Sequence, residues 1–138
     1  MKNIIIILLF SLIYISCGPK NLAKDFTKFK TGSFLYYYKG EQRKDDITFS
    51  INRNDSIQTE TNSKSGKTST YKIKWTDSSK YELYFLKSTD NLSDSIIKRK
   101  QAYPLKTLIL DTADNYCIFE SKKDDSEFKL SDTLWIKK

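Results

Sequence analysis

Few residues of this 138-residue chain have the types and spacing that catalysis requires. The chain contains no histidine, which removes the commonest general base, the usual zinc ligand and the Ser-His-Asp arrangement. Adjacent carboxylates occur at Asp45 and Asp46 and at Asp124 and Asp125, but acid–base catalysis needs two groups that converge on one substrate atom. The sequence also lacks a glycine-rich phosphate loop, a nucleophile elbow and clustered metal ligands. We therefore expect a protein that is not an enzyme and that uses no cofactor or metal.

The chemistry that the sequence does predict concerns Cys17. Lys2 is followed by an apolar run from Ile4 to Ile15, and the small Ser16 directly precedes the cysteine. This layout is typical of a secretory signal, and a cysteine directly after the cleavage position is typical of a bacterial lipoprotein signal. We therefore predict a signal peptide at 1–16. The new N-terminal cysteine is then expected to carry a diacylglyceryl thioether and an amide-linked acyl chain such as palmitate.

Two other interpretations of the N-terminal segment stay open. One is a retained transmembrane helix, although a span takes about 20 apolar residues and Gly18 and Pro19 end this shorter run. The other is an ordinary cleaved signal with an incidental cysteine, because Tyr14 stands where the lipoprotein pattern usually has an aliphatic residue. On the lipoprotein interpretation, the acyl chains contribute roughly 0.8 kcal/mol of membrane affinity per buried methylene. We expect an exported protein anchored in the bacterial envelope, at the periplasmic or surface face of the outer membrane.

The mature chain is moderately basic. Removing the signal removes one charged residue, Lys2, and leaves 23 Lys and Arg against 17 Asp and Glu, a net charge of +6. The positive residues are scattered, with clusters such as those at 98–100 and 137–138, and no nucleic-acid motif accompanies them. We therefore expect a solvated lysine-rich surface that does not bind nucleic acid.

Cys117 is the other cysteine of the chain. Once Cys17 is lipidated, Cys117 has no partner for an intramolecular disulfide. It lies in an apolar run, so we predict a small buried side chain rather than a reactive thiol.

From Gly32 onward the apolar residues alternate at the period of β-strands. Tight turns separate seven or eight short segments of this kind, namely 33–39, 46–52, 56–61, 68–75, 81–86, 102–110, 116–121 and 130–136. Strand–helix alternation is absent, which predicts an all-β antiparallel meander. Such a meander hides its edges by curling into a lipocalin-like barrel or a strongly bent sheet.

Two segments fall outside this alternation. Residues 88–101 are polar and charged, and a short helix N-capped by Asp90 or a long surface loop would both fit them. Residues 17–31 contain the lipidated cysteine and a short tether, in which Leu22, Phe26 and Phe29 fall at helical spacing. We therefore divide the chain into a signal peptide at 1–16, this tether, and a single β domain at 32–138.

Alternation also assigns side chains to the two faces of the strands. In 46–61 we expect a hairpin with a polar outer face, in which Ile57, Thr59 and Thr61 lie opposite Gln58 and Glu60. The residues predicted to fill the core or to line a ligand cavity are Phe34, Tyr36, Phe49, Tyr71, Trp75, Tyr81 and Phe85. The apolar residues predicted to face outward are Leu35, Tyr37, Tyr84, Leu86 and Trp135.

Several of these segments resemble a family of small Bacteroidetes-type lipoproteins. The resemblance lies in Phe29–Gly32 with Phe34, in Ile51–Ser56, in Tyr71–Trp75 with Tyr81–Leu83, and in the run from Tyr116 to Glu120. In that family a cysteine often precedes the Phe-Lys-Thr-Gly block and another lies between the Trp and the Tyr. Phe26 and Ser79 hold those places here, which fits the joint loss of one bridge. The resemblance implies a lipobox and a lipocalin-like β domain, and it carries no established activity.

Taken together, these patterns predict a membrane-anchored envelope lipoprotein with a non-enzymatic binding or interaction domain. Its expected partners are the membrane, through the lipid on Cys17, and an envelope protein or a small apolar ligand. The alternative function is a lipocalin-like carrier that holds the apolar ligand inside the barrel. An interior cavity of roughly 300 Å³ or more would favour the carrier, and a filled interior would favour the interaction domain.

Overall fold

The computed structural model describes residues 24–38, 47–127 and 129–138. The predicted signal peptide and Cys17 lie outside these residues, as do Asp45 and Asp46. The described chain forms a short 3-10 helix, η1, then eight strands and one α-helix. The elements are η1 (Thr27–Phe29), β1 (Gly32–Tyr38), β2 (Ile47–Arg53), β3 (Ile57–Asn62), β4 (Thr68–Trp75), β5 (Lys80–Ser88), α1 (Asp94–Ala102), β6 (Leu105–Thr112), β7 (Tyr116–Lys122) and β8 (Lys129–Ile136).

The eight strands form a closed barrel in which every strand pairs antiparallel with its neighbours in sequence. The barrel closes where β1 meets β8, through the pairs Phe34–Ile136, Leu35–Trp135 and Tyr36–Leu134. Closure leaves no free sheet edge, which is how antiparallel proteins avoid edge-to-edge association. The prediction of an antiparallel meander that curls into a barrel is confirmed.

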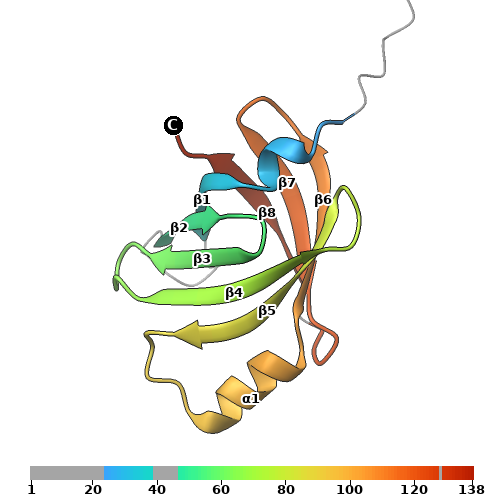
Figure 1. Cartoon of the computed structure of the whole chain (residues 1–138). Coiled ribbons are helices and arrows are strands. Elements are labelled where there is room, and N and C mark those ends of the chain that lie inside the picture. Colours follow the sequence, from blue (N-terminus) through green and yellow to red (C-terminus); the bar gives the residue numbers. More distant parts are fainter. Residues whose placement is uncertain (1–23, 39–46, 128) are drawn as a thin grey trace, which may run out of the picture.

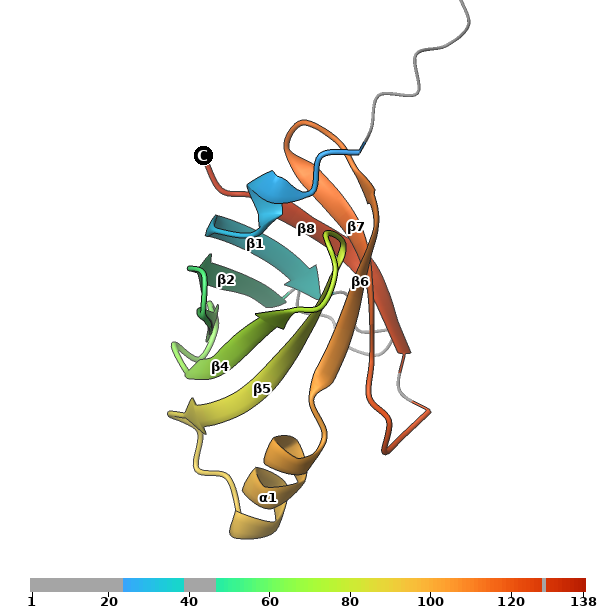
Figure 2. The same cartoon turned by 45° about the vertical axis from the view of Figure 1, so that its right-hand side comes forward.

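The two helices lie at opposite ends of the barrel (Figures 1 and 2). η1 lies beside the start of β1 and the β6–β7 turn, at the end where the chain also finishes. Its Phe29 is fully buried and stacks on Phe34, with 6.1 Å between the ring centroids. Phe26 packs against the same core. The aromatic residues of the predicted helical turn therefore fill one end of the barrel.

The segment after β5 contains a helix, and Asp90 does not begin it. α1 starts at Asp94 after an N-cap at Ser93, and the carboxylate of Asp90 instead pairs with Lys67 Nζ at 2.6 Å. The following strand begins at Leu105 rather than Ala102, because α1 continues through Ala102. Pro104 then lacks the backbone N–H that a helix or a sheet would use.

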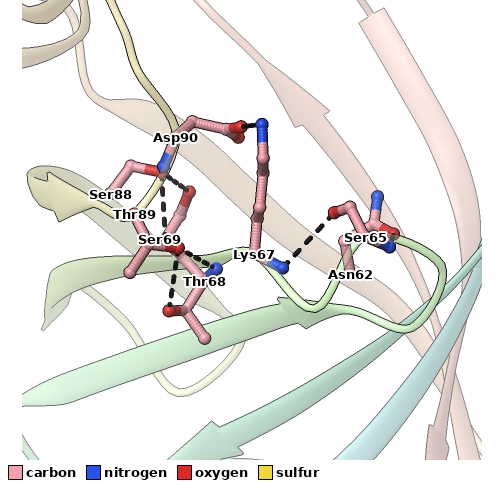
Figure 3. A network of polar contacts seen from close by, with 8 residues as sticks. All are labelled: Asn62, Ser65, Lys67, Thr68, Ser69, Ser88, Thr89 and Asp90. Carbon is pink, nitrogen blue, oxygen red and sulfur yellow. Dashed lines mark hydrogen bonds and ion pairs between the residues drawn. The ribbon is translucent and has the colours of Figure 1, made fainter.

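A polar network fixes the point where the chain leaves the barrel toward α1 (Figure 3). The hydroxyls of Ser69 and Ser88 lie 3.1 Å apart across β4 and β5, and the backbone N–H of Thr68 donates to Thr89 Oγ1 at 2.8 Å. The ion pair of Lys67 with Asp90 joins the β3–β4 turn to the same segment. α1 then reaches across this end of the barrel, because Arg99 Nε donates to Asp125 in the β7–β8 turn at 2.5 Å.

The faces of most strands agree with the alternation of the sequence. Ile73, Leu83 and Leu134 are almost fully buried, while Trp135 faces outward and is 36% exposed. Cys117 is a fully buried free thiol, as predicted. No helix among residues 24–38, 47–127 and 129–138 is long and apolar enough to cross a membrane.

The predicted orientation of β3 is wrong. Gln58 is only 2% exposed and Glu60 lines the barrel interior, whereas the polar outer face was expected to contain them. The register explains the inversion, since Gln58 lies directly opposite Arg53 of β2, whose side chain also points inward. β3 therefore turns its polar side chains toward a buried cation.

Candidate functional site

Arg53, at the end of β2, is the buried cation of the barrel interior among the residues that the structure describes. Its side chain is 5% exposed, and its guanidinium donates three hydrogen bonds. Nη1 donates to the carbonyl oxygen of Phe29 at 2.6 Å, Nε to Gln58 Oε1 at 2.7 Å, and Nη2 to the Tyr81 hydroxyl at 3.0 Å. Arg53 therefore joins η1 to β3 and β5 from inside the barrel.

Aromatic rings surround the same guanidinium. Its central carbon lies 4.6 Å from the ring centroid of Tyr81, 5.3 Å from that of Phe34 and 5.9 Å from that of Trp75. Contacts of this kind stabilise a cation by about 0.5–2 kcal/mol each, more when water is excluded. No described carboxylate is in direct contact with Arg53, and the rings and the three acceptors together compensate for the burial of its charge.

Gln58 connects this cation to a carboxylate. While its Oε1 accepts from Arg53, its Nε2 donates to Glu60 Oε1 at 2.7 Å. Burial raises the pKa of Glu60, and the hydrogen bond from Gln58 and the charges of Arg53 and Lys100 oppose this rise. Burial also raises the pKa of the nearby Tyr71 hydroxyl, and the charge of Glu60 adds to the effect. Arg53, Gln58 and Glu60, which we call the polar ladder, thus place a positive and a negative group on one interior wall.

A cavity of about 120 Å³ lies inside the barrel, and all three residues of the polar ladder line it. Glu60 lies on its wall, and across from β3 the hydroxyls of Thr107 and Ser121 are hydrogen-bonded to each other at 2.8 Å. The rest of the wall is largely apolar and includes Tyr36, Phe49, Leu83, Leu105, Phe119 and Leu130. Arg53 and Gln58 also line the cavity, but the Arg53 guanidinium already donates to Phe29, Gln58 and Tyr81. The cavity therefore combines a hydrophobic volume with one guanidinium that has three acceptors, one amide, one carboxylate and one hydroxyl pair.

The size of this cavity limits what it can hold. Typical sites for drug-sized ligands measure roughly 300–1,000 Å³, and an engineered cavity of about 150 Å³ holds benzene. A volume near 120 Å³ therefore suits a ligand of roughly six non-hydrogen atoms. On the η1 side, the buried side chains of Phe29, Phe34 and Arg53 fill the interior. The barrel is therefore partly filled, and it is neither a hollow carrier nor a solid core.

The seven aromatic residues predicted for the interior separate into three groups. Phe34 and Trp75 pack around Arg53, and Tyr36, Phe49 and Tyr81 line the cavity. Tyr71 and Phe85 pack edge to face, with 5.8 Å between centroids. Lys100 of α1 lies over the Phe85 ring at 5.4 Å.

The polar ladder was missed by reasoning from the sequence. One signal for it existed: Arg53 is in phase with Phe49, which was assigned to the interior, so alternation alone places Arg53 inside. Gln58 and Glu60 carried no such signal. Ile57, Thr59 and Thr61 form the more apolar face of that strand, so alternation predicts that this face, and not Gln58 and Glu60, points inward.

The other chemically capable residues do not form a second site. Burial raises the pKa of the Cys117 thiol to about 12. The exposed Asp124 pairs with Lys106, and Asp125, whose side chain is 8% exposed, pairs with Arg99 at 2.5 Å, so both carboxylates are held in ion pairs. In the described part of the chain, no group of three or more His, Cys, Asp or Glu residues is arranged to hold a metal ion.

Comparisons with known proteins add no assignment to this geometry. No protein-family model, no curated protein and no solved structure matches the chain. The resemblance to Bacteroidetes-type lipoproteins therefore remains an expectation from the residues that carry it. The function of the chain must be inferred from the barrel and from the chemistry of its interior.

Proposed function

We propose that this chain is an exported, lipid-anchored β-barrel that binds a small amphiphilic ligand in its interior without catalysing a reaction. The ligand is a short apolar group of about six non-hydrogen atoms, and it carries a positively charged amine. Its apolar part occupies the cavity and its ammonium group pairs with Glu60. This replaces the purely apolar ligand expected from the sequence, since a carboxylate lies on the cavity wall.

The observation that carries the proposal is the position of Glu60. Its carboxylate lies on the cavity wall, and its Oε1 accepts a hydrogen bond from Gln58 on the same strand. Its pKa is raised because burial disfavours the ionised form. A ligand that brings a positive charge to within hydrogen-bond distance would reverse that penalty, because an opposite charge at short range favours ionisation. The apolar walls then select for a short hydrocarbon rather than for a hydrated ion.

Calorimetric titration with two matched ligand series tests this proposal. The amine series runs from ethylamine to hexylamine, and the alcohols of the same chain lengths replace the ammonium group by a neutral hydroxyl. We expect binding to strengthen with chain length until the cavity is full and then to weaken. We also expect amines to bind at least about tenfold more tightly than alcohols, which corresponds to about 1.4 kcal/mol.

Two variants identify the carboxylate that is responsible. Glu60→Gln should abolish the preference for amines over alcohols while leaving the alcohols unaffected. Glu120→Gln removes an equal charge from the outer wall, where Glu120 pairs with Lys129 at 2.8 Å, and should change neither series. Equal affinity for amines and alcohols, or amine binding that survives Glu60→Gln, would contradict the proposed ligand class.

The anchor is tested separately. Metabolic labelling with an alkyne palmitate analogue should label the full chain, and Cys17→Ser should abolish the label and release the protein from the membrane fraction. Cys117→Ser is the matched control, because Cys117 is fully buried and should have no part in lipidation. A Cys17→Ser protein that stayed membrane-bound would instead favour a retained transmembrane segment.

A further inference from the structure

Apolar side chains gather on the outer wall where β6, β7, β8 and β1 adjoin. Trp135 of β8 lies between Leu35 of β1 and Tyr116 of β7 in the register. The rings of Tyr116 and Trp135 are 4.9 Å apart. Ile118 follows two positions after Tyr116 and therefore shares its face, and Leu110 lies at the β6 bulge, 42% exposed. We call Leu35, Leu110, Tyr116, Ile118 and Trp135 the outer stripe.

The outer stripe adjoins the place where the described chain begins. Lys24 Nζ donates to the carbonyl oxygen of Leu110 at 3.1 Å and pairs with Asp111 at 3.0 Å. Lys28 Nζ donates to the carbonyl oxygen of Ala113 at 2.5 Å. These contacts hold the first described residues against the β6–β7 turn, beside Leu110. Figures 1 and 2 both show the chain reaching the barrel at this turn.

The length of chain before Lys24 sets how far a lipid at Cys17 can be from the outer stripe. Cys17 precedes Lys24 by seven positions. A fully extended chain covers at most about 3.6 Å per residue, or about 25 Å for seven residues. An anchor on Cys17 therefore keeps this side of the barrel close to the bilayer surface.

The composition of the outer stripe suits that location. Tyr and Trp are enriched at membrane–water interfaces, because each has an apolar ring and a polar group that stays hydrated. The other strongly exposed apolar side chains are Tyr37 near the end of β1, Leu86 of β5, Ile96 of α1 and Tyr103 directly after α1, which are 42–45% exposed. They include no tryptophan, and α1 lies at the end of the barrel away from η1, where the chain from Cys17 does not arrive (Figure 1).

We infer that the outer stripe is the surface that the barrel turns toward the bilayer carrying its anchor, with Trp135 at the level of the lipid headgroups. The inference rests on the lipid anchor proposed for Cys17 and is independent of the ligand proposed for the cavity. We favour a bilayer over a protein partner because the outer stripe lies beside Lys24, where the chain from the anchored Cys17 reaches the barrel.

Tryptophan fluorescence tests the inference, because the chain has only two tryptophans. The lipidated full chain is reconstituted into vesicles of phosphatidylethanolamine and phosphatidylglycerol, with or without lipids brominated near the headgroup. Trp75→Phe makes Trp135 the only tryptophan. This variant is expected to fold, since Trp75 Nε1 is buried without a hydrogen-bond partner among the described residues; Trp75→Tyr is the second choice.

Bilayer contact should shift the emission of Trp135 to shorter wavelength and let brominated lipids quench it. In the matched control, Trp75→Phe and Trp135→Phe are combined with Leu86→Trp, which moves the only indole to β5. Its emission should be insensitive to brominated lipid. Sedimentation with the vesicles reports the anchor in the same samples.

Three outcomes would overturn the inference. The first is a protein that sediments with vesicles but whose Trp135 emission is not quenched, which would leave the anchor intact. The second is a shift of Trp135 emission without quenching by brominated lipid, which indicates a protein partner or a second copy at the outer stripe. The third is failure to sediment, which removes the anchor on which the inference depends. The amine titration is unaffected in all three cases, so the two proposals fail independently.

Discussion

Replacing Arg53 by methionine removes the charge at the centre of the barrel while keeping an unbranched side chain of similar length. The substitution deletes the hydrogen bonds to Phe29, Gln58 and Tyr81 and deprives the buried carboxylate of Glu60 of the charge of Arg53. Hydrogen bonds to charged groups contribute roughly 1.5–3 kcal/mol each, but the variant no longer bears the cost of burying a guanidinium. Arg53 and Glu60 are joined through Gln58 rather than in direct contact, and removing one partner of a buried charged pair costs about 3–5 kcal/mol. We expect a loss of that size in the free energy of unfolding.

Urea unfolding followed by far-UV circular dichroism measures this loss. With a slope of about 2 kcal/mol per molar urea for a domain of this size, the midpoint should fall by roughly 2 M. The double variant Arg53→Met with Glu60→Gln should be more stable than the sum of the single effects predicts. The reason is that Glu60→Gln removes the carboxylate that Arg53→Met leaves uncompensated.

Lys129→Met is the matched control. It also replaces a cation by methionine, but Lys129 is 64% exposed and pairs with Glu120 at the surface, so its effect should stay within about 1 kcal/mol. If Arg53→Met cost no more than Lys129→Met, the polar ladder would not hold η1 and β3 in place, and the reasoning would be refuted.

Three further predictions concern single positions. Since burial raises the native pKa of Glu60 above its ordinary value of 4.5, the native state binds the proton more tightly and stability falls as pH rises from about 4.5 through the raised pKa. Glu60→Gln should flatten that part of the stability–pH curve and raise stability at pH 7 by about 1.4 kcal/mol for each pH unit that separates the native pKa from the ordinary one; an unchanged curve would contradict this. The thiol of Cys117, with a pKa of about 12, should react with iodoacetamide at pH 8 only as fast as the protein unfolds, and rapid labelling of the native protein would count against its burial. Gly32 has a φ of +130° and Gly66 a φ of +69°, so in thermal unfolding Gly32→Ala should cost about 1–3 kcal/mol. Gly66→Asn should cost less, because asparagine tolerates the left-handed region.

The barrel could be predicted because most of its strands obey the simplest physical rule of a half-buried sheet. In β2, β4 and β5 the apolar side chains recur every second residue, and burial of that face fixes which way each strand faces. Apart from the segment that contains α1, the connections between strands are shorter than the crossovers that a parallel sheet needs. Antiparallel pairing of sequence neighbours then follows, and the β1–β8 closure removes the last two edges.

The candidate site could not be predicted in the same way, because its members compensate one another across the barrel. Gln58 and Glu60 are buried only because Arg53 lies opposite them, and an isolated polar side chain would cost several kcal/mol to bury there. The start of α1 was missed for a related reason. Asp90 is a good N-cap by composition, but its carboxylate is taken by Lys67, which is distant in sequence.

The closure of the barrel by β1 and β8 has a consequence for when the protein can fold. Phe34 and Ile136 pair across 102 positions, and bringing the ends of so long a loop together costs about 4 kcal/mol of chain entropy. Contacts this far apart in sequence slow folding, and β8 must be available before the barrel can close. A chain exported with its N-terminus first, as we propose, would therefore cross the membrane with the barrel still open and could close it only after the last strand had emerged.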